Sequence, residues 1–169
     1  MDDELAAFCR AEHRRLVGAL SLYCRDRHVA EELAQETVVR VISNWRTVRR
    51  LDSPAAWAHR VAINLANSHL RRRLAERRAV RRLFSRQTVA QRDPDTPTAI
   101  AVRAAVAALP KRERAVVVLR FFADFSVRDV AEMLGLPEGT VKTLTARALV
   151  ALRGAGLQEF READDAHRP

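Results

Sequence analysis

Apolar residues recur every three or four positions through two segments of the first half of the chain. This spacing places them on one face of a helix and leaves polar residues on the other face, which is typical of an amphipathic helix. The sequence therefore predicts helices over residues 4–22 and 28–43. Their expected buried residues are Leu5, Phe8, Cys9, Leu16, Leu20, Val29, Leu33, Val41 and Ile42.

Residues 44–53, with the sequence NWRTVRRLDS, break the helical spacing and predict a loop. Ser53 and Pro54 then form a typical helix start, because a serine side chain caps the first free N–H groups and proline fits the first turn. A long helix is predicted from this point to about residue 83, with an arginine-rich end. Its expected inward-facing residues are Trp57, Val61, Ala62 and Leu65.

The second half of the chain begins after a change in composition. Residues 85–98 are polar and contain two prolines, which is typical of a linker between domains. Further helices are predicted over residues 98–109 and 111–123, and the abundance of Ala, Leu, Arg and Glu indicates an all-α fold. The predicted organisation is two small helical domains joined by a flexible linker: residues 1–84, the linker 85–98, residues 99–155 and a polar tail over 156–169.

The end of the second domain has the spacing of a helix-turn-helix. Ser126 is predicted to cap a short helix in a capping box with Asp129, and Gly135 to end that helix in a left-handed conformation. A last helix is predicted to run to about Arg153. A helix of this kind can place its N-terminal half in the major groove, so the segment predicts DNA binding. Its outward positions are Lys142, Thr143, Ala146 and Arg147.

The distribution of charge supports a nucleic-acid partner. The 169 residues carry a net charge of +9 and a pI near 11.1, which favours binding to a polyanion. Residues 37–92 hold fourteen arginines against Asp52 and Glu76, whereas residues 1–36 have a net charge of −3. We therefore expect the basic middle of the chain to contact nucleic acid, with a solvated helix face as the alternative interpretation.

Several classes of protein are not expected. The sequence has no run of about 18 apolar residues, as a membrane span requires, and its acidic opening does not look like an export signal. Two cysteines, Cys9 and Cys24, are too few for a disulfide framework, so we expect a cytoplasmic protein. Because the sequence has no glycine-rich phosphate loop, metal-ligand cluster or activated nucleophile, we expect no enzymatic activity, metal or cofactor.

Both halves of the chain resemble the same protein family. HVAEELAQETVVRVISNWRTV followed by PAAWAHRVAINLANSHLRRR is similar to the second conserved region of bacterial sigma factors. LPKRERAVVVLRFFADFSVRDVAEMLGLPEGTVKTLTARALVALR is similar to their fourth conserved region. Their order on a short chain resembles the extracytoplasmic-function type, in particular its compact actinobacterial SigE-like members. The resemblance implies a promoter-specificity subunit that binds core RNA polymerase, recognises −10 and −35 elements and promotes DNA melting.

The resemblance also implies roles for individual residues. The stretch AEELAQE matches the helix that docks on core polymerase, residues 44–53 match the loop that captures a flipped −10 base, and Asn64 aligns with an asparagine that helps to hold this base. The implied polymerase-binding residues are Glu31, Glu32, Leu33, Gln35 and Glu36. The implied −10 residues are Asn44, Trp45, Val48, Arg60, Asn64, Arg71, Arg72 and Arg73. The implied −35 residues are Arg120, Lys142, Thr143 and Arg147.

Two other functions remain open from the residues. The chain could be a stand-alone helix-turn-helix transcriptional regulator whose basic first half only adds affinity for DNA. It could also be an arginine-rich helical protein that binds RNA. The family resemblance, in turn, implies that an anti-sigma factor could be a further partner, and no small-molecule substrate is expected.

Overall fold

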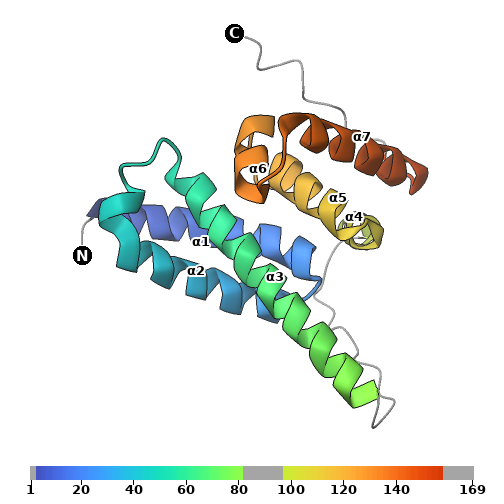
Figure 1. The fold of residues 1–169 in the computed structure, drawn as a ribbon, viewed down its shortest axis with the longest axis horizontal. Helices are drawn as coiled ribbons and strands as arrows, with labels where there is room; N and C mark the ends of the chain where they lie inside the picture. The colour runs from blue at the N-terminus through green and yellow to red at the C-terminus, as the bar shows by residue number, and fades with distance from the viewer. Residues whose placement is uncertain (1–2, 82–96, 158–169) are drawn as a thin grey trace.

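The computed structural model describes residues 3–81 and 97–157, and every regular element in these two ranges is a helix (Figure 1). The prediction of an all-α protein is therefore confirmed. The first half contains α1 (Asp3–Cys24), α2 (Arg27–Val48) and α3 (Pro54–Arg81). The second half contains α4 (Pro97–Ala108), α5 (Lys111–Val117), the π-helical turn η1 (Val118–Phe122), α6 (Val127–Leu134) and α7 (Glu138–Gly154). Within the described ranges, no helix combines the length and the apolar character needed to cross a membrane.

The predicted loop over residues 44–53 is wrong in its first half. The helix α2 continues to Val48, so only residues 49–53 connect it to α3. Trp45 and Val48 extend the apolar face begun by Val41, and the three residues are only 8%, 1% and 2% exposed. Polar residues separate Val41, Trp45 and Val48 in the sequence, so their helical spacing was not recognised there. Most of the predicted linker, residues 85–96, lies outside the described residues, and the following helix α4 starts at Pro97.

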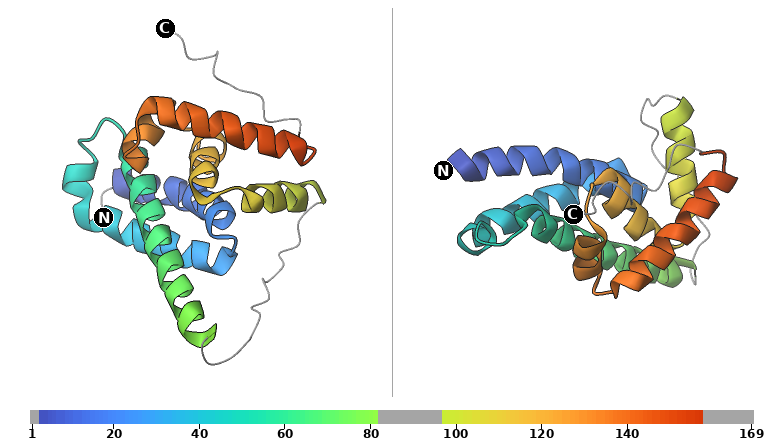
Figure 2. Two further views of the ribbon diagram at one scale, coloured as in Figure 1. Left: turned by 45° about the vertical axis from the view of Figure 1, so that its right-hand side comes forward. Right: turned by 90° about the horizontal axis from the view of Figure 1, so that it is seen from above.

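The three helices of the first half all pack against one another. A two-residue connection turns α1 back along α2, and α3 crosses both of them (Figure 2). Asp26 caps the start of α2, where its carboxylate accepts a hydrogen bond from the Val29 N–H at 3.2 Å. Tyr23 is 1% exposed and joins α1 to α3, because its hydroxyl donates to Asn67 Oδ1 at 2.7 Å. The side chains of Leu16 and Leu20 fill the space between these helices.

The predicted helix-turn-helix is present in the second half. Ser126 Oγ accepts from the Asp129 N–H at 3.1 Å, and Asp129 Oδ2 accepts from the Ser126 N–H at 3.1 Å, so the predicted capping box is confirmed. Gly135 ends α6 with a φ of 63°, the left-handed conformation expected for a glycine at this place. The chain then turns through Pro137 into α7, which packs on α5 and α6.

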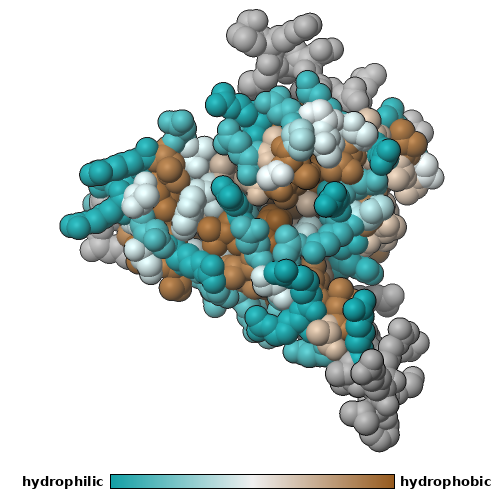
Figure 3. Space-filling view, in the orientation of Figure 1, coloured by the Kyte–Doolittle hydropathy of each residue, from teal (hydrophilic) through white to brown (hydrophobic). Residues whose placement is uncertain are grey.

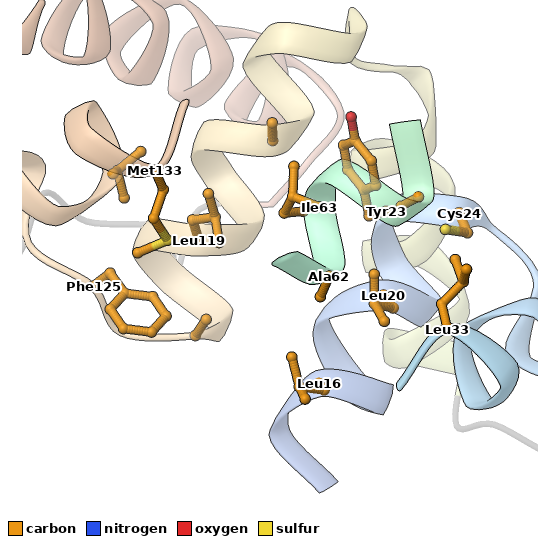
Figure 4. Close-up of a cluster of buried hydrophobic side chains, with 14 of the residues drawn as sticks. Leu16, Leu20, Tyr23, Cys24, Leu33, Ala62, Ile63, Leu119, Phe125 and Met133 are labelled. Carbon is orange, nitrogen blue, oxygen red and sulfur yellow. The ribbon is translucent and has the colours of Figure 1, made fainter. Parts of the chain in front are cut away.

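The two halves do not lie apart. One hydrophobic core contains Leu16, Leu20 and Ile63 from the first half together with Phe125 and Met133 from the second half. Figure 4 shows the first-half residues on one side of the cluster and the second-half residues on the other. A small helical domain can bury only a limited fraction of its surface. The shared cluster therefore adds apolar burial that neither half has alone.

A buried carboxylate lies beside this shared core. Glu12 is 6% exposed, and its carboxylate oxygens lie 2.8 Å from Arg15 Nη1 and 3.3 Å from His59 Nε2. The ring of His59, 1% exposed, meets the edge of Phe125 with the ring centroids 4.9 Å apart. Burial alone would raise the pKa of Glu12, but the hydrogen bonds and positive charge of His59 and Arg15 outweigh it and lower this pKa below its ordinary value of 4.5.

We predict that Glu12 makes the stability of the folded chain dependent on acid pH. A carboxyl whose folded pKa is lowered stabilises the fold above its unfolded pKa, and that contribution is lost as the pH falls through the folded pKa. Glu12→Gln should lower the free energy of unfolding by about 1.5–3 kcal/mol at pH 7. In urea titrations from pH 7 to pH 3, the free energy of unfolding should decrease less below about pH 5 for this variant than for the unmodified chain. The exposed Glu132→Gln serves as the control, and parallel pH curves for all three proteins would contradict the prediction.

Candidate nucleic-acid interface

One face of α3 carries a row of exposed polar and basic side chains. Arg60, Asn64 and Arg71 are spaced by four and seven residues, so they lie on the same side of the helix. All three are exposed, and so is the adjacent Arg72. The helix rises 1.5 Å per residue, so this row extends over about 17 Å. In Figure 3 hydrophilic side chains follow α3 and gather at the corner between α2 and α3.

Arg73 differs from its two neighbours. It is half-buried, and its Nη1 lies 3.6 Å from Oδ2 of Asp26, the residue that caps α2. Within the described residues, Arg71 donates to Ser68 Oγ on its own helix, at 3.2 Å. Of the three consecutive arginines predicted to bind phosphates, Arg71 and Arg72 are therefore presented to the solvent, whereas Arg73 joins α3 to α2.

The residues predicted to form the wall of a base pocket do not line a common surface. Trp45 and Val48 are buried in a core cluster with Leu5 and Val41, so they line no surface. Asn44 is exposed on α2, but its side-chain Nδ2 donates to the Arg40 carbonyl at 2.8 Å. Trp45 and Val48 therefore do not form the predicted pocket wall. The reason is the same as for the predicted loop over residues 44–53: α2 continues to Val48, and its apolar face points inward.

A cleft of about 470 Å³ opens next to the short connection between α2 and α3. The first half lines it with residues of the connection and of the first two turns of α3, and the second half lines it with residues of α6. The lining residues from the first half are Leu51, Asp52, Ser53, Ala56, Trp57 and Arg60. Trp57, which was assigned to the core, is half-buried and contacts both the core and this cleft. The cleft therefore offers apolar, acidic and hydroxyl groups beside the row on α3.

A group of arginines at the end of α2 is not among the site residues predicted from the sequence. Arg46, Arg49 and Arg50 are exposed and border a hollow of about 650 Å³ together with Thr47 and Leu51. The cationic run at 49–50 is visible in the sequence, but its proximity to Arg46 follows only from the extension of α2. These residues continue the positive surface of α3 around the corner of the first half.

The outward residues of α7 lie where the sequence placed them. Lys142, Thr143 and Arg147 are exposed, whereas Val141 and Thr145 on the opposite side are buried. Thr143 Oγ1 donates to the Gly139 carbonyl at 2.9 Å, which leaves its methyl group and its lone pairs outward. The arrangement gives α7 a face with two cations and a small polar side chain, which are groups that contact base edges and phosphates.

Arg120 does not join this face. It is half-buried in η1, and its Nη1 donates to the Phe125 carbonyl at 2.8 Å. The guanidinium therefore holds the loop that precedes α6. The structure gives Arg120 a contact within the fold, in contrast to Lys142 and Arg147.

The acidic residues of α2 form a second exposed face. Glu32, Gln35 and Glu36 are exposed, and Glu36 pairs with Arg40 at 2.7 Å on the same helix. Glu31 is half-buried and pairs with the neighbouring Arg27 at 3.0 Å. The fifth residue of the implied docking set, Leu33, is only 7% exposed and faces the core. The available surface is therefore made by Glu32, Gln35 and Glu36 with part of Glu31.

Fold and surface together define a DNA-binding protein built from two helical domains, and comparisons with known proteins specify the family. Residues 8–76 match Sigma-70 region 2, and residues 99–152 match Sigma-70, region 4. The ECF RNA polymerase sigma factor SigM of Mycobacterium tuberculosis is 34% identical over 143 residues, which cover 85% of this chain and 72% of that protein. The ECF RNA polymerase sigma factor SigX of Bacillus subtilis is 30% identical over 150 residues, which cover 83% and 77%.

A solved structure shares the same fold. The sigma factor RpoE of Bartonella quintana, solved in complex with the anti-sigma factor NepR, gives a TM-score of 0.73 over 93% of this chain and 96% of that chain, at 22% identity. This chain belongs to the extracytoplasmic-function group of the sigma-70 family. It is a sigma factor, a promoter-specificity subunit and not an enzyme. Because both halves match the family, a stand-alone regulator and an RNA-binding protein are not favoured.

We predict that Arg71 and Arg72 bind DNA phosphates and that Arg73 does not. Each lost phosphate contact should flatten the log–log dependence of duplex affinity on salt by about 0.9. Arg71→Ala and Arg72→Ala should each show this change in fluorescence anisotropy titrations between 50 and 200 mM salt. Arg73→Ala, the matched control, should keep the slope, because its partner is Asp26. If all three variants kept the salt slope of the unmodified chain, Arg71 and Arg72 would belong to a solvated face.

Proposed function

We propose that the chain docks on core RNA polymerase through α2, reads a −10 element along α3 and reads a −35 element with α7. The observation that carries this proposal is the separation of three exposed surfaces on three helices: acidic on α2, amide and arginine on α3, and lysine, threonine and arginine on α7. Such a chain acts where the polymerase and the chromosome are, in the cytoplasm. The related sigma factor RpoE was solved with an anti-sigma factor, and we infer a partner of this kind here too.

We infer that opening of the −10 DNA uses the row on α3 and the cleft beside it. Without ATP, strand separation needs a protein that stabilises an unstacked base, whose extrusion costs a few kcal/mol. Asn64 offers both a donor and an acceptor to a base edge. Arg60 and Arg71, on the same face, offer phosphate contacts that fix the backbone on either side. Asp52 and Ser53 in the cleft supply further acceptors and a hydroxyl to an extruded base.

We infer that the −35 element is read from the major groove by the N-terminal half of α7. Lys142 and Arg147 can donate to guanine acceptors or phosphates, and the Thr143 methyl group can contact a thymine methyl group. Leu144 and Thr145 face inward, since Leu144 is half-buried against the core and Thr145 is 8% exposed. The inferred reading set on this helix is therefore Lys142, Thr143, Ala146 and Arg147.

The docking surface is tested by reversing charges on α2. Glu32→Lys together with Glu36→Lys should abolish co-purification with core polymerase, because the acidic face would then repel a basic partner surface. Far-ultraviolet circular dichroism should stay unchanged, since both residues are exposed. Glu76→Lys, an exposed acidic residue on α3, is the control and should co-purify normally. Undiminished co-purification of the double variant would remove α2 from the docking surface.

The role of Asn64 is tested by separating DNA opening from docking. Asn64→Ala removes the amide, and alanine is a better helix former, so polymerase binding should not change. The equilibrium constant for open-complex formation should fall roughly 5- to 150-fold. This corresponds to about 1–3 kcal/mol, the cost of a lost buried hydrogen bond. Permanganate footprinting on duplex and on pre-melted templates measures open-complex formation. Pre-melting should restore only part of the open complex that the variant loses.

Asn44→Ala is the matched control for this experiment. Asn44 is also an exposed asparagine on a neighbouring helix, but its amide is engaged by the Arg40 carbonyl. It should therefore open DNA as the unmodified chain does. Normal opening by Asn64→Ala, or an equal defect in both variants, would show that another group holds the base.

A further inference from the structure

A groove of about 960 Å³ follows α1, with α2 on one side and α4 and η1 on the other. Small and apolar residues of α1 and α4 make up much of its lining: Val17, Gly18, Ala19, Leu22, Ala99 and Val102. A Cβ atom added to Gly18 would meet no atom within 4 Å, so the groove is open at this point of α1. A hollow of this size and lining suits a peptide segment that carries apolar side chains.

Arginines from three helices line the same groove. Arg14 and Arg15 belong to α1, Arg27 to α2 and Arg103 to α4. Among the described residues that line the groove, Glu31 is the one carboxylate, and it pairs with Arg27 at 3.0 Å. Four cations and one anion give the groove a positive potential, which favours an acidic segment as its occupant.

The end of α7 directs the following chain toward this groove. Gly156 has a φ of 85°, and the Leu157 N–H donates to the Leu152 carbonyl at 3.1 Å, as in a Schellman motif. Leu157 then packs against a core cluster that also contacts Leu22 and Val102, two residues of the groove. In both views of Figure 2 the end of α7 lies near α4. The last described residue is therefore fixed beside the cluster that borders the groove.

The segment that follows has the chemistry that the groove requires. Residues 158–169 lie outside the described residues, and their sequence is QEFREADDAHRP. Phe160 follows Leu157 by three residues, so it can reach about 10 Å from it along an extended chain. Two arginines of the segment are outnumbered by four acidic residues: Glu159, Glu162, Asp164 and Asp165. Residues 82–96, the other segment outside the described ranges, carry three arginines and two aspartates and thus have the wrong net charge.

We propose that residues 158–169 bind back into this groove, with Phe160 on the apolar lining and the acidic residues against the arginines. This binding does not depend on the proposed function, but its consequence does. The α2 side of the groove includes Glu31 and Gln35, two residues implied in polymerase docking. The segment therefore competes with core polymerase for this part of α2, and it lowers the apparent affinity of the chain for polymerase.

Occupation of the groove is measured by paramagnetic broadening of amide signals in NMR spectra of the full chain. Ala163→Cys carries a nitroxide within the segment. Burial raises the pKa of Cys24 to about 12 and also raises the pKa of Cys9, so the introduced thiol reacts first at pH 7. The Leu22 signal in the groove should be broadened far more than the Asn44 signal at the other end of α2.

Two variants of the groove should release the segment, each beside a matched control. Gly18→Leu projects a side chain into the open space and should remove most of the broadening, whereas Gly18→Ala leaves this space free and should keep it. Arg14→Glu should weaken the broadening by repulsion. Arg10→Glu, an exposed position one turn earlier and not among the groove residues, should not.

Three results of the NMR experiment would overturn the proposal. The first is equal broadening of the Leu22 and Asn44 signals in the chain with native Gly18. The second is unchanged broadening in both Gly18→Leu and Arg14→Glu. The third is broadening of the Leu22 signal when the nitroxide and the isotope label are on separate chains, because the segment would then bind a second copy.

The competition is measured by titrating fluorescently labelled core polymerase with each full chain. Gly18→Leu should bind polymerase about 2- to 10-fold more tightly than the unmodified chain and Gly18→Ala, because its α2 surface is no longer covered. Equal or weaker binding by Gly18→Leu, with its broadening lost as expected, would show that the segment does not compete with polymerase. If no form bound polymerase, the proposed function itself would be wrong, whereas the broadening would still report occupation of the groove.

Discussion

The guanidinium of Arg114 joins the carbonyl ends of two helices that belong to different halves of the chain. It donates to Tyr23 at the end of α1 and, from Nη2, to Ala107 and Leu109 at the end of α4, at 2.8 and 3.0 Å. Carbonyl groups in the last turn of a helix lack partners and carry the negative end of its dipole, so one fixed cation satisfies both ends. The position of α5, and of α7 packed on it, relative to α1 depends on this interaction.

The helices could be predicted from the sequence because their signals are local. The capping box at Ser126 and the left-handed Gly135 depend on residues within one or two turns, and both were found where expected. The end of α2 was missed because its buried residues, Trp45 and Val48, alternate with polar ones. Ile42 was expected to be buried and is 45% exposed, since a hydrophobic residue at a helical position does not by itself define the core face.

The surfaces that face solvent could be predicted better than the contacts between the halves. The apolar residues of α7 define its buried face, and the opposite face must then be exposed. Lys142 and Arg147 could therefore be identified without knowing which helices pack against α7. The bond from Arg15 to Ala123 joins positions 108 residues apart and ends on a main-chain carbonyl, which leaves no pattern in the sequence. The contact of Arg120 within the fold could not be predicted for the same reason, because its acceptor is the Phe125 carbonyl. Sequence periodicity reports which residues are buried, but not which distant backbone they meet.

The boundary between the halves combines charged and apolar groups. A boundary made only of packed apolar residues would be harder to separate, because all of its area loses contact with protein and gains contact with water. Here the charged groups of Glu12, Arg15 and Arg114 lie at or beside the boundary, and water can solvate them once the halves part. The free-energy cost of separating the two halves then comes mainly from the apolar contacts of Phe125 and its neighbours.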